Sequence, residues 1–307
     1  MADATGRQEP VVARFAAQNS SGRGAGPKRL AGLVSSGIAL VTLLGGCSVE
    51  DAFYFGWPRT KLTPQAKQMY DLWIGSAIAA LIVGVFVWGL IFWCVIRYRK
   101  RGEELPPQTR YNLPMEQLYS VLPFLIVAVL FYNTAVTESY VNRQSGNPDV
   151  NVEVVAFKWN WQFRYLDAKN TEDQPVETIG SSEYVPVLVV PVGKKIRFTE
   201  VAKDVIHSFW VPDLLFKRDV IPGVVNSFEV TVNKTGAFVG RCAEFCGTYH
   251  SMMNFELRAV SPENYEKFIA AKQAGRSTPE ALGEIGESPL ATTTRPYTTD
   301  RTARTSN

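Results

Sequence analysis

The chain has 307 residues, of which 46% are hydrophobic, and its 32 Lys and Arg residues against 29 Asp and Glu residues give a net charge of +3. This length allows one ordinary globular domain together with other segments. The small net charge, without a basic stripe interleaved with aromatic residues, excludes nucleic acid as a partner. The four cysteines are too scattered for the disulfide framework of a small secreted protein.

The N-terminal segment, residues 1–46, has the pattern of a secretory signal peptide. A polar leader that ends in two basic residues is followed by an uncharged apolar run over residues 30–46. Residues 44–47, Leu-Gly-Gly-Cys, resemble the bacterial lipobox, which implies cleavage before Cys47 and lipidation of that cysteine. The alternative is an uncleaved apolar N-terminus with an inert Cys47.

Two longer uncharged stretches predict a transmembrane helical hairpin, which follows an outer linker over residues 47–71. Residues 72–96 and residues 117–137 are each long enough to cross a hydrocarbon core of about 30 Å. The connecting loop, residues 97–116, begins with a cluster of Arg and Lys, which is typical of the cytoplasmic side. We therefore expect a multi-pass protein of the plasma membrane, with both outer ends of the hairpin and the following domain on the outer face.

Residues 138–273 have the composition of an all-β domain. Short β-rich runs alternate with Gly, Pro and Asn, and seven or more such strands predict a sandwich or barrel. Ser261 followed by Pro262 is typical of a helix start, so residues 262–273 are expected to form one closing helix. The tail, residues 274–307, is rich in Gly, Ser, Thr, Pro and Arg, and we expect it to be disordered.

The segment from Cys242 to Met253 concentrates metal-binding side chains in the pattern C-x-E-x-C-G-x-x-H-x-x-M. Thiolate and thioether sulfur are soft ligands that select copper, and imidazole suits copper as well. His207 is the only histidine outside this segment, so a shared site would bring two loops together at one end of the sandwich. Two thiolates that bridge two copper ions, with one histidine on each ion, leave weak positions for Met253 and for the backbone carbonyl of Glu244.

Three other interpretations of the cysteine segment stay open at this point. Cys242 and Cys246 could form a disulfide in an exported domain, although this leaves both histidines unexplained. A Cys–His nucleophile needs a thiol beside a base, which does not explain a second cysteine and a methionine. A site with two histidines and two cysteines could also hold zinc, which has no use for the methionine.

The sequence resembles that of cytochrome c oxidase subunit II over about residues 70–269. The resemblance is carried by the cysteine segment and by the pattern H-S-[FW]-x-x-P-x-x-x-x-K-x-D-x-x-P-G from His207 to Gly223. It implies a two-helix transmembrane hairpin plus an all-β, cupredoxin-like Greek-key sandwich that holds a dinuclear copper centre, CuA. The Glu244 side chain is implied to reach a magnesium or manganese ion shared with subunit I, and a carboxylate suits so hard an ion. The implied copper ligands are His207, Cys242, Glu244 through its carbonyl, Cys246, His250 and Met253.

The resemblance also assigns roles to two residues outside the copper segment. Trp159 is similar to the family's tryptophan that accepts electrons from cytochrome c; its alternative is a core aromatic residue, which is our expectation for Trp161. Glu116, just before the second apolar stretch, is similar to a glutamate at the entrance of a proton pathway into subunit I; its alternative is a solvated carboxylate. An acidic stretch within residues 167–183 is either a docking surface for a basic cytochrome c or a hydrated loop.

The function that the resemblance implies is that of an oxidoreductase subunit. The chain would accept single electrons from cytochrome c, or from a cytochrome c domain, and pass them to haem in subunit I, where oxygen is reduced to water with proton pumping. Subunit III is a further implied partner. A quinol oxidase subunit normally lacks the copper ligands, and a nitrous oxide reductase requires a second, histidine-rich copper site. A copper-binding membrane lipoprotein for copper delivery or assembly remains the alternative.

Overall fold

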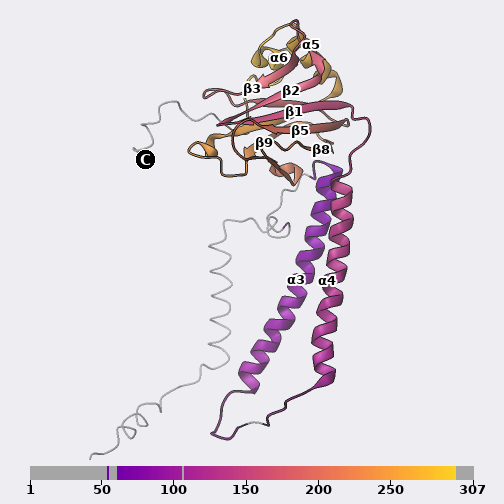
Figure 1. The fold of residues 1–307 in the computed structure, drawn as a ribbon, viewed down its shortest axis with the longest axis vertical. Coiled ribbons are helices and arrows are strands. Elements are labelled where there is room, and N and C mark those ends of the chain that lie inside the picture. Colours follow the sequence, from indigo (N-terminus) through magenta and orange to yellow (C-terminus); the bar gives the residue numbers. More distant parts are fainter. Residues whose placement is uncertain (1–53, 55–60, 106, 295–307) are drawn as a thin grey trace, which may run out of the picture. The chain divides into compact units, whose positions relative to one another are not determined.

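The computed structural model describes residues 54, 61–105 and 107–294. The predicted signal peptide, the lipobox cysteine Cys47 and residues 295–307 lie outside the described residues. Within the described part, the chain forms a hairpin of two long helices, then a sandwich of two β-sheets, and then two shorter helices (Figure 1).

The hairpin consists of α3 (Pro64–Arg97) and α4 (Leu113–Val141). Thr63 caps α3, because its hydroxyl accepts a backbone N–H at 2.9 Å and a proline follows at the first helical position. Both helices are long and apolar enough to cross a membrane, with mean hydropathy of 2.6 and 1.8 in their most apolar windows. They extend beyond the uncharged stretches 72–96 and 117–137, because capped polar turns lengthen each helix at its ends.

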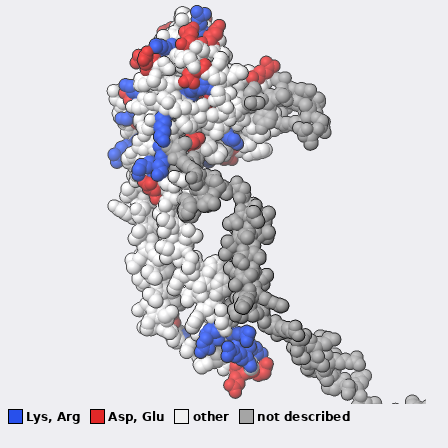
Figure 2. All heavy atoms as spheres, turned by 180° about the vertical axis from the view of Figure 1, so that it is seen from behind, with Lys and Arg blue, Asp and Glu red and all other residues white. Residues whose placement is uncertain are grey.

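Charge in the hairpin is concentrated at the turn between the two helices. In Figure 2, Lys and Arg side chains gather around this turn, whereas the helices themselves are almost free of charge. A basic cluster beside an apolar helix predicts that the turn stays in the cytoplasm. The basic residues of the turn are Arg97, Arg99, Lys100, Arg101 and Arg110.

The sandwich is built from two five-stranded sheets, with strand orders β3-β2-β1-β5-β8 and β4-β10-β9-β6-β7. The pairs β1–β5 and β4–β10 are parallel, and the other neighbouring strands are antiparallel. The first sheet contains β1 (Val150–Phe157), β2 (Asn160–Lys169), β3 (Pro175–Ile179), β5 (Lys195–Ala202) and β8 (Asn226–Thr231). The second contains β4 (Val187–Pro191), β6 (His207–Val211), β7 (Phe216–Val220), β9 (Gly236–Cys242) and β10 (Asn254–Val260).

Aromatic rings from both sheets fill the space between them. The Phe209 ring stacks on Phe255 with centroids 4.8 Å apart, and Phe228 packs against Phe198 at 5.2 Å. Trp161 is fully buried and meets Phe255 edge to face at 5.3 Å, so the expectation that Trp161 belongs to the core is confirmed. Because full burial of such a side chain stabilises the fold by about 1.5–3 kcal/mol, these rings hold the two sheets in a fixed relation.

Glu200 is an acidic residue within this apolar core. Its side chain is fully buried on β5, and neither carboxylate oxygen has a hydrogen-bond partner. Burial raises the pKa of Glu200 to about 9, and attraction to Arg218 offsets only part of this effect. In the folded protein, Glu200 is therefore protonated near neutral pH.

The Glu200→Gln variant is expected to lose much of the pH dependence of stability. The folded-state pKa of about 9 lies above the ordinary value of 4.5. Between these pH values the unfolded chain releases a proton that the folded chain keeps, so the free energy of unfolding falls by about 1.4 kcal/mol per pH unit as pH rises. Denaturant unfolding at pH 5 to 8 measures this slope, with the exposed Glu172→Gln as the control. Equal slopes for wild type and Glu200→Gln would contradict the prediction.

Two helices follow β10 and pack on the sandwich. They are α5 (Pro262–Gln273) and α6 (Thr278–Glu284), and α6 begins with a reciprocal capping box between Ser277 and Glu280. The expectation that residues 274–307 are disordered is wrong for residues 274–294, since apolar side chains of α6 are fully buried. Composition alone predicted disorder because apolar residues are few in this segment. Their spacing, which composition does not record, places them on one face of a short helix.

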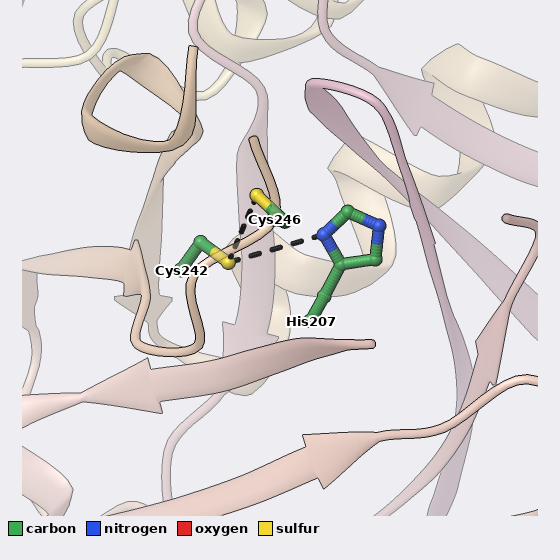
Figure 3. A group of neighbouring side chains, drawn as sticks. All are labelled: His207, Cys242 and Cys246. Atoms are coloured by element: carbon green, nitrogen blue, oxygen red, sulfur yellow. Dashed lines mark hydrogen bonds between the residues drawn. The ribbon is translucent and has the colours of Figure 1, made fainter. Parts of the chain in front are cut away.

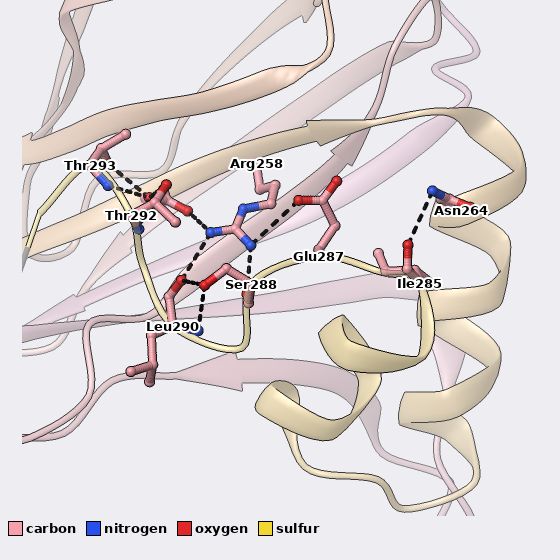
Figure 4. A network of polar contacts seen from close by, with 9 residues as sticks. Arg258, Asn264, Ile285, Glu287, Ser288, Leu290, Thr292 and Thr293 are labelled. Atoms are coloured by element: carbon pink, nitrogen blue, oxygen red, sulfur yellow. Dashed lines mark hydrogen bonds and ion pairs between the residues drawn. The ribbon is translucent and has the colours of Figure 1, made fainter.

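A buried ion pair fixes the segment after α6, residues 285–294, which we call the C-terminal strap. Arg258 and Glu256, both on β10, form an ion pair with at most 2% of either side chain exposed. Arg258 also donates to the backbone carbonyls of Ser288 and Leu290 (Figure 4). The Glu256 carboxylate accepts hydrogen bonds from the backbone and hydroxyl groups of Thr292 and Thr293. The strap thus supplies hydrogen-bond partners to both buried charges, and Nε of Arg258 is the one nitrogen of that side chain that is left without a partner in the described chain.

Candidate metal centre

His207 and Cys242 lie at the same end of the second sheet. His207 is the first residue of β6, and Cys242 is the last residue of β9. The two strands pair antiparallel with Phe209 opposite Cys242. After Cys242 the chain forms a loop with a short 3-10 turn, η3 (His250–Met252), before it returns as β10. Strand pairing therefore joins side chains that are 35 residues apart in sequence.

Five side chains converge at this end through sulfur and nitrogen atoms. Sγ of Cys242 lies 3.8 Å from Sγ of Cys246 and 3.9 Å from Nδ1 of His207 (Figure 3). Sγ of Cys246 lies 3.6 Å from Nδ1 of His250 and 3.8 Å from Sδ of Met253. The structure thus brings together all five side chains that the sequence analysis singled out as copper ligands. We call these five residues the copper cluster.

The two thiols of the copper cluster are spaced for a metal ion and not for a disulfide. A disulfide requires a sulfur–sulfur distance of about 2.05 Å, whereas Cys242 and Cys246 are both free at 3.8 Å. Bonds from thiolate to metal are about 2.3 Å long, so one ion can contact both sulfur atoms at this separation. The disulfide interpretation is therefore wrong for this structure. A thioether beside two thiols and two imidazoles is a soft ligand set, which fits copper better than zinc.

Glu244 approaches the copper cluster through its backbone. Its carbonyl oxygen lies 3.3 Å from Sγ of Cys242, beside the position where the sequence analysis expects a weak ligand. Its side chain lies outside the cluster: it is 45% exposed, and one carboxylate oxygen is 4.0 Å from Nζ of Lys217. The backbone carbonyl of this residue therefore lies beside the copper cluster, whereas its carboxylate lies near a lysine.

Asp204 orients His207, and the sequence analysis missed this role. One carboxylate oxygen of Asp204 lies 2.8 Å from Nε2 of His207, which leaves Nδ1 beside the thiol of Cys242. A carboxylate on the distal ring nitrogen fixes the tautomer and orientation of a metal-binding histidine. Burial lowers the pKa of His207, but its contacts with Cys242 and Asp204 outweigh burial and raise the pKa overall. An acidic residue three positions before a candidate ligand was the available sequence signal.

The two thiols differ in how easily they ionise. Burial raises the pKa of Cys242, but the contact with His207 and nearby backbone groups outweigh it and lower the pKa to about 7. Burial and the charge of Cys242 together raise the pKa of Cys246 to about 12. Because thiols bind a metal ion as thiolates, metal binding releases the protons of both cysteines.

Trp161 on β2 and Trp159 in the turn between β1 and β2 support the loop that carries the ligands. The indole N–H of Trp161 donates to the backbone carbonyl of Met253 at 3.2 Å. The indole N–H of Trp159 donates to the backbone carbonyl of Cys246 at 3.0 Å, and its ring meets Tyr249 edge to face at 4.7 Å. Trp159 is half-buried, whereas Trp161 is fully buried. Trp159 therefore connects the copper cluster to the protein surface.

Glu116 lies apart from the copper cluster, in the first turn of α4. Its carboxylate accepts the backbone N–H of Asn112 at 2.9 Å, and the Asn112 side chain accepts the backbone N–H of Met115 at 3.4 Å. This reciprocal pattern satisfies free donors at the helix start. The structure thus gives Glu116 a local capping role, which does not itself test a role in proton uptake.

Comparisons with known proteins decide the family. Residues 150–260 match the family described as "Cytochrome C oxidase subunit II, periplasmic domain". The "Probable cytochrome c oxidase subunit 2" of Nocardia farcinica is 46% identical, and the match covers 90% of this chain and 90% of that protein. The chain belongs to the cytochrome c oxidase subunit 2 family. Its relative in Mycobacterium bovis, "Cytochrome c oxidase subunit 2", is 40% identical over 92% of this chain and 93% of its own length.

A solved structure with a similar domain is the periplasmic domain of subunit II of cytochrome oxidase from Bradyrhizobium japonicum. It is 27% identical and covers 42% of this chain and 97% of its own, with a TM-score of 0.38. The family assignment rests on the sequence relatives and not on this likeness.

Membership of the family confirms several expectations from the sequence. The chain is a subunit II of cytochrome c oxidase, an oxidoreductase complex, and its sandwich is the cupredoxin-like domain of that family. The chain is a membrane protein with an outer domain. The family and the cluster of His207, Cys242 and Cys246 together point to copper. The relatives named here give no support to a separate role in copper delivery.

Proposed function

We propose that the chain accepts single electrons from cytochrome c at a dinuclear CuA centre and passes them to haem in subunit I, where oxygen is reduced to water with proton pumping. The observation that carries this proposal is the convergence of two thiols, two imidazoles and a thioether at one end of the sandwich. Within it, His207, Cys242 and Cys246 form the one group of His, Cys, Asp and Glu side chains among the described residues that is placed to hold a metal ion.

The chain's own residues supply the ligands and a dry, rigid surrounding. Copper held by the two thiols, the two imidazoles, the thioether and one carbonyl would supply a site that accepts and releases single electrons. Cys242, Cys246 and Met253 are at most 7% exposed, so water is excluded from the sulfur atoms. The residues that hold copper are His207, Cys242, Glu244 through its carbonyl, Cys246, His250 and Met253.

Trp159 is the residue at which we propose that electrons arrive. Its indole is half-buried, so one edge is accessible to a donor protein, and its N–H bonds to the carbonyl of Cys246, a proposed copper ligand. Gly247 allows this close approach. It has φ of 116°, and a Cβ atom there would lie 3.3 Å from the indole of Trp159. The route from the surface to Cys246 thus consists of one ring and one hydrogen bond.

Replacing Trp159 by phenylalanine is expected to slow copper reduction by cytochrome c about tenfold or more, which corresponds to about 1.4 kcal/mol in the barrier. An aromatic ring is kept, but the hydrogen bond from the indole N–H to the backbone carbonyl of Cys246 is lost. Stopped-flow absorbance on the purified oxidase measures the rate, and the copper spectrum reports whether the centre is intact. Trp210→Phe is the matched control, because Trp210 lies on the opposite face of β6 from His207 and Phe209. The role of Trp159 fails if both variants react at the wild-type rate.

The hairpin supports a proposal for how the chain is placed in the membrane. We place α3 and α4 across the plasma membrane as a multi-pass anchor, with the basic turn in the cytoplasm and the sandwich on the outer face. The support is their apolar composition and the charge at the turn. Cys47 is then the lipidated N-terminal residue, and Glu116 lies at the cytoplasmic end of α4, where a proton pathway into subunit I would begin. Subunits I and III cover the apolar helix faces that the chain itself leaves open.

A second metal site shared with subunit I is proposed at the Glu244 side chain. The carboxylate lies outside the copper cluster and is 45% exposed, so another subunit can reach it. Carboxylate oxygen is a preferred ligand of magnesium and manganese. Glu244 then links the two subunits through its side chain while its carbonyl serves the copper centre.

The proposal is tested on the full chain purified from membranes. We expect a haem-bearing subunit to copurify with it, and we expect a mixed-valence copper spectrum with one electron shared over two ions. Electron paramagnetic resonance records the mixed-valence spectrum, and metal analysis counts the copper ions. A chain that binds only zinc, or a single copper ion, would contradict the dinuclear centre. A copper-loaded chain without a haem-bearing subunit would instead support the delivery role.

A further inference from the structure

The loop between β9 and β10, residues 243–253, contacts the indole of Trp159 in three ways, and we call it the ligand loop. The backbone carbonyl of Cys246 accepts the indole N–H at 3.0 Å. The backbone of Gly247 lies so close that a Cβ atom there would be 3.3 Å from Nε1 and Cζ2 of the indole. The ring of Tyr249 meets the indole edge to face, with centroids 4.7 Å apart and an interplanar angle of 88°. A carbonyl, a glycine and a ring of one short segment therefore determine where the indole lies.

Tyr249 is fixed relative to the copper cluster by the backbone of the ligand loop. It directly precedes His250 and begins the short turn η3. Its carbonyl accepts the backbone N–H of Met252 at 2.9 Å, and the backbone N–H of His250 donates to the carbonyl of Gly247 at 3.1 Å. Nδ1 of His250 in turn lies 3.6 Å from Sγ of Cys246. The turn that places a proposed copper ligand therefore also places the ring of Tyr249.

The hydrogen bond to Cys246 does not by itself fix the plane of the Trp159 ring. The outer torsion of a tryptophan side chain has broad minima, so the ring can tilt about its own bonds. Trp159 is half-buried, so water can compete for its N–H when the ring tilts. Perpendicular aromatic pairs have a preferred geometry, and Tyr249 supplies such a partner. The ring of Tyr249 therefore limits the tilt that would break the hydrogen bond.

We infer that Tyr249 is a positioning residue for electron entry, whose ring holds the Trp159 indole in the orientation that keeps its N–H bonded to the carbonyl of Cys246. The inference rests on the role proposed above for Trp159 as the residue at which electrons arrive. One electron leaves the haem of the donor and is taken up by copper, and Tyr249 is neither oxidised nor reduced. Tyr249 thus acts on the rate of transfer through Trp159, and not on the affinity for the donor.

Replacing Tyr249 by leucine is expected to slow copper reduction at saturating cytochrome c by about two- to tenfold, the range by which an aromatic pair usually shifts an equilibrium. Tyr249→Phe keeps the ring and is expected to keep the wild-type rate. Stopped-flow absorbance on the purified oxidase, over a range of donor concentrations, separates this rate from the donor affinity. Tyr111→Leu is the matched control, because it makes the same change at a ring that is 72% exposed between α3 and α4.

A second measurement uses the full chain without copper, in detergent, with nitrogen-15 in its tryptophans. Nuclear magnetic resonance follows hydrogen exchange of each indole N–H, and the Trp159 signal is the one that Trp159→Phe lacks. Tyr249→Leu is expected to raise exchange at Trp159 about two- to tenfold, and to leave it unchanged at Trp161, whose N–H bonds to the carbonyl of Met253. An unchanged rate at Trp159 would overturn the inference. A parallel rise at Trp161 would also overturn it, because the whole ligand loop has then loosened.

The double variant Trp159→Phe/Tyr249→Leu separates this inference from the proposed function. If Tyr249 acts through Trp159, the double variant reduces copper at the rate of Trp159→Phe to within about twofold. A larger further loss, a loss confined to donor affinity, or an altered copper spectrum in Tyr249→Leu would each assign Tyr249 another role and overturn the inference. If Trp159→Phe slows copper reduction but Tyr249→Leu does not, the inference alone fails. If Trp159→Phe reacts at the wild-type rate, the proposed role of Trp159 fails as well.

Discussion

Replacing Cys246 by serine is expected to abolish the mixed-valence copper spectrum and to lower electron transfer through the oxidase by more than about 100-fold. Loss of a residue that merely orients a metal ligand costs about 10–100-fold, and Cys246 contacts three of the other four members of the copper cluster. Its sulfur lies 3.8 Å from Cys242, 3.6 Å from His250 and 3.8 Å from Met253. A serine hydroxyl is a hard ligand and cannot replace a bridging thiolate.

Metal analysis, paramagnetic resonance and cytochrome c oxidation by the purified complex measure this effect. Cys94→Ser is the matched control, because Cys94 is an exposed free thiol on α3 and should leave all three measurements unchanged. Near-ultraviolet circular dichroism shows whether the Cys246→Ser domain is folded. A folded Cys246→Ser protein with two coppers and wild-type turnover would overturn the assignment of Cys246 as a ligand.

Replacing Arg258 by methionine is expected to destabilise the sandwich by about 3–5 kcal/mol, which is the usual cost of removing one partner from a buried ion pair. The change leaves the Glu256 carboxylate buried with its charge unpaired and removes the bonds to the carbonyls of Ser288 and Leu290. Burial raises the pKa of Glu256, but hydrogen bonds from the strap and the contact with Arg258 outweigh it, so the pKa is lowered overall. The strap should therefore detach before the domain unfolds.

Denaturant unfolding of the full chain gives the change in stability, and hydrogen exchange of residues 285–294 reports detachment of the strap. The double variant Glu256→Leu/Arg258→Met removes both charges and is expected to recover part of the loss. Arg276→Gln is the control, because Arg276 and Glu284 form a pair with 59% and 51% of their side chains exposed, which is worth less than about 1 kcal/mol. A loss below about 1 kcal/mol in Arg258→Met would contradict a structural role for the buried pair.

The copper cluster could be predicted from sequence because its chemistry is concentrated in residue types that are rare in this chain. Both histidines and two of the four cysteines belong to it, and four of its five members lie within one short segment. Asp204 and Tyr249 could not be assigned in the same way. Acidic and aromatic residues are common, and their contacts with His207 and Trp159 depend on how the loops fold.

Three strands have weak local signals in the sequence. β6 (His207–Val211) begins with the ligand histidine and ends at a proline, and β7 (Phe216–Val220) carries three charged residues in a row. β6 pairs with β7 and also with β9. Because β9 is distant in the sequence, the residues of β6 and β7 alone do not reveal this pairing. β3 (Pro175–Ile179) starts with a proline, which is tolerated because β3 is an edge strand.

The C-terminal strap has a consequence for how the outer domain can be isolated. The residues that match the family end at Val260, and the closing helix α5 ends at Gln273. A soluble fragment cut at either residue leaves Arg258 and Glu256 without the backbone groups of residues 288–293 that satisfy them. A fragment for metal loading or crystallisation therefore has to continue to residue 294, beyond the last residue of the family match.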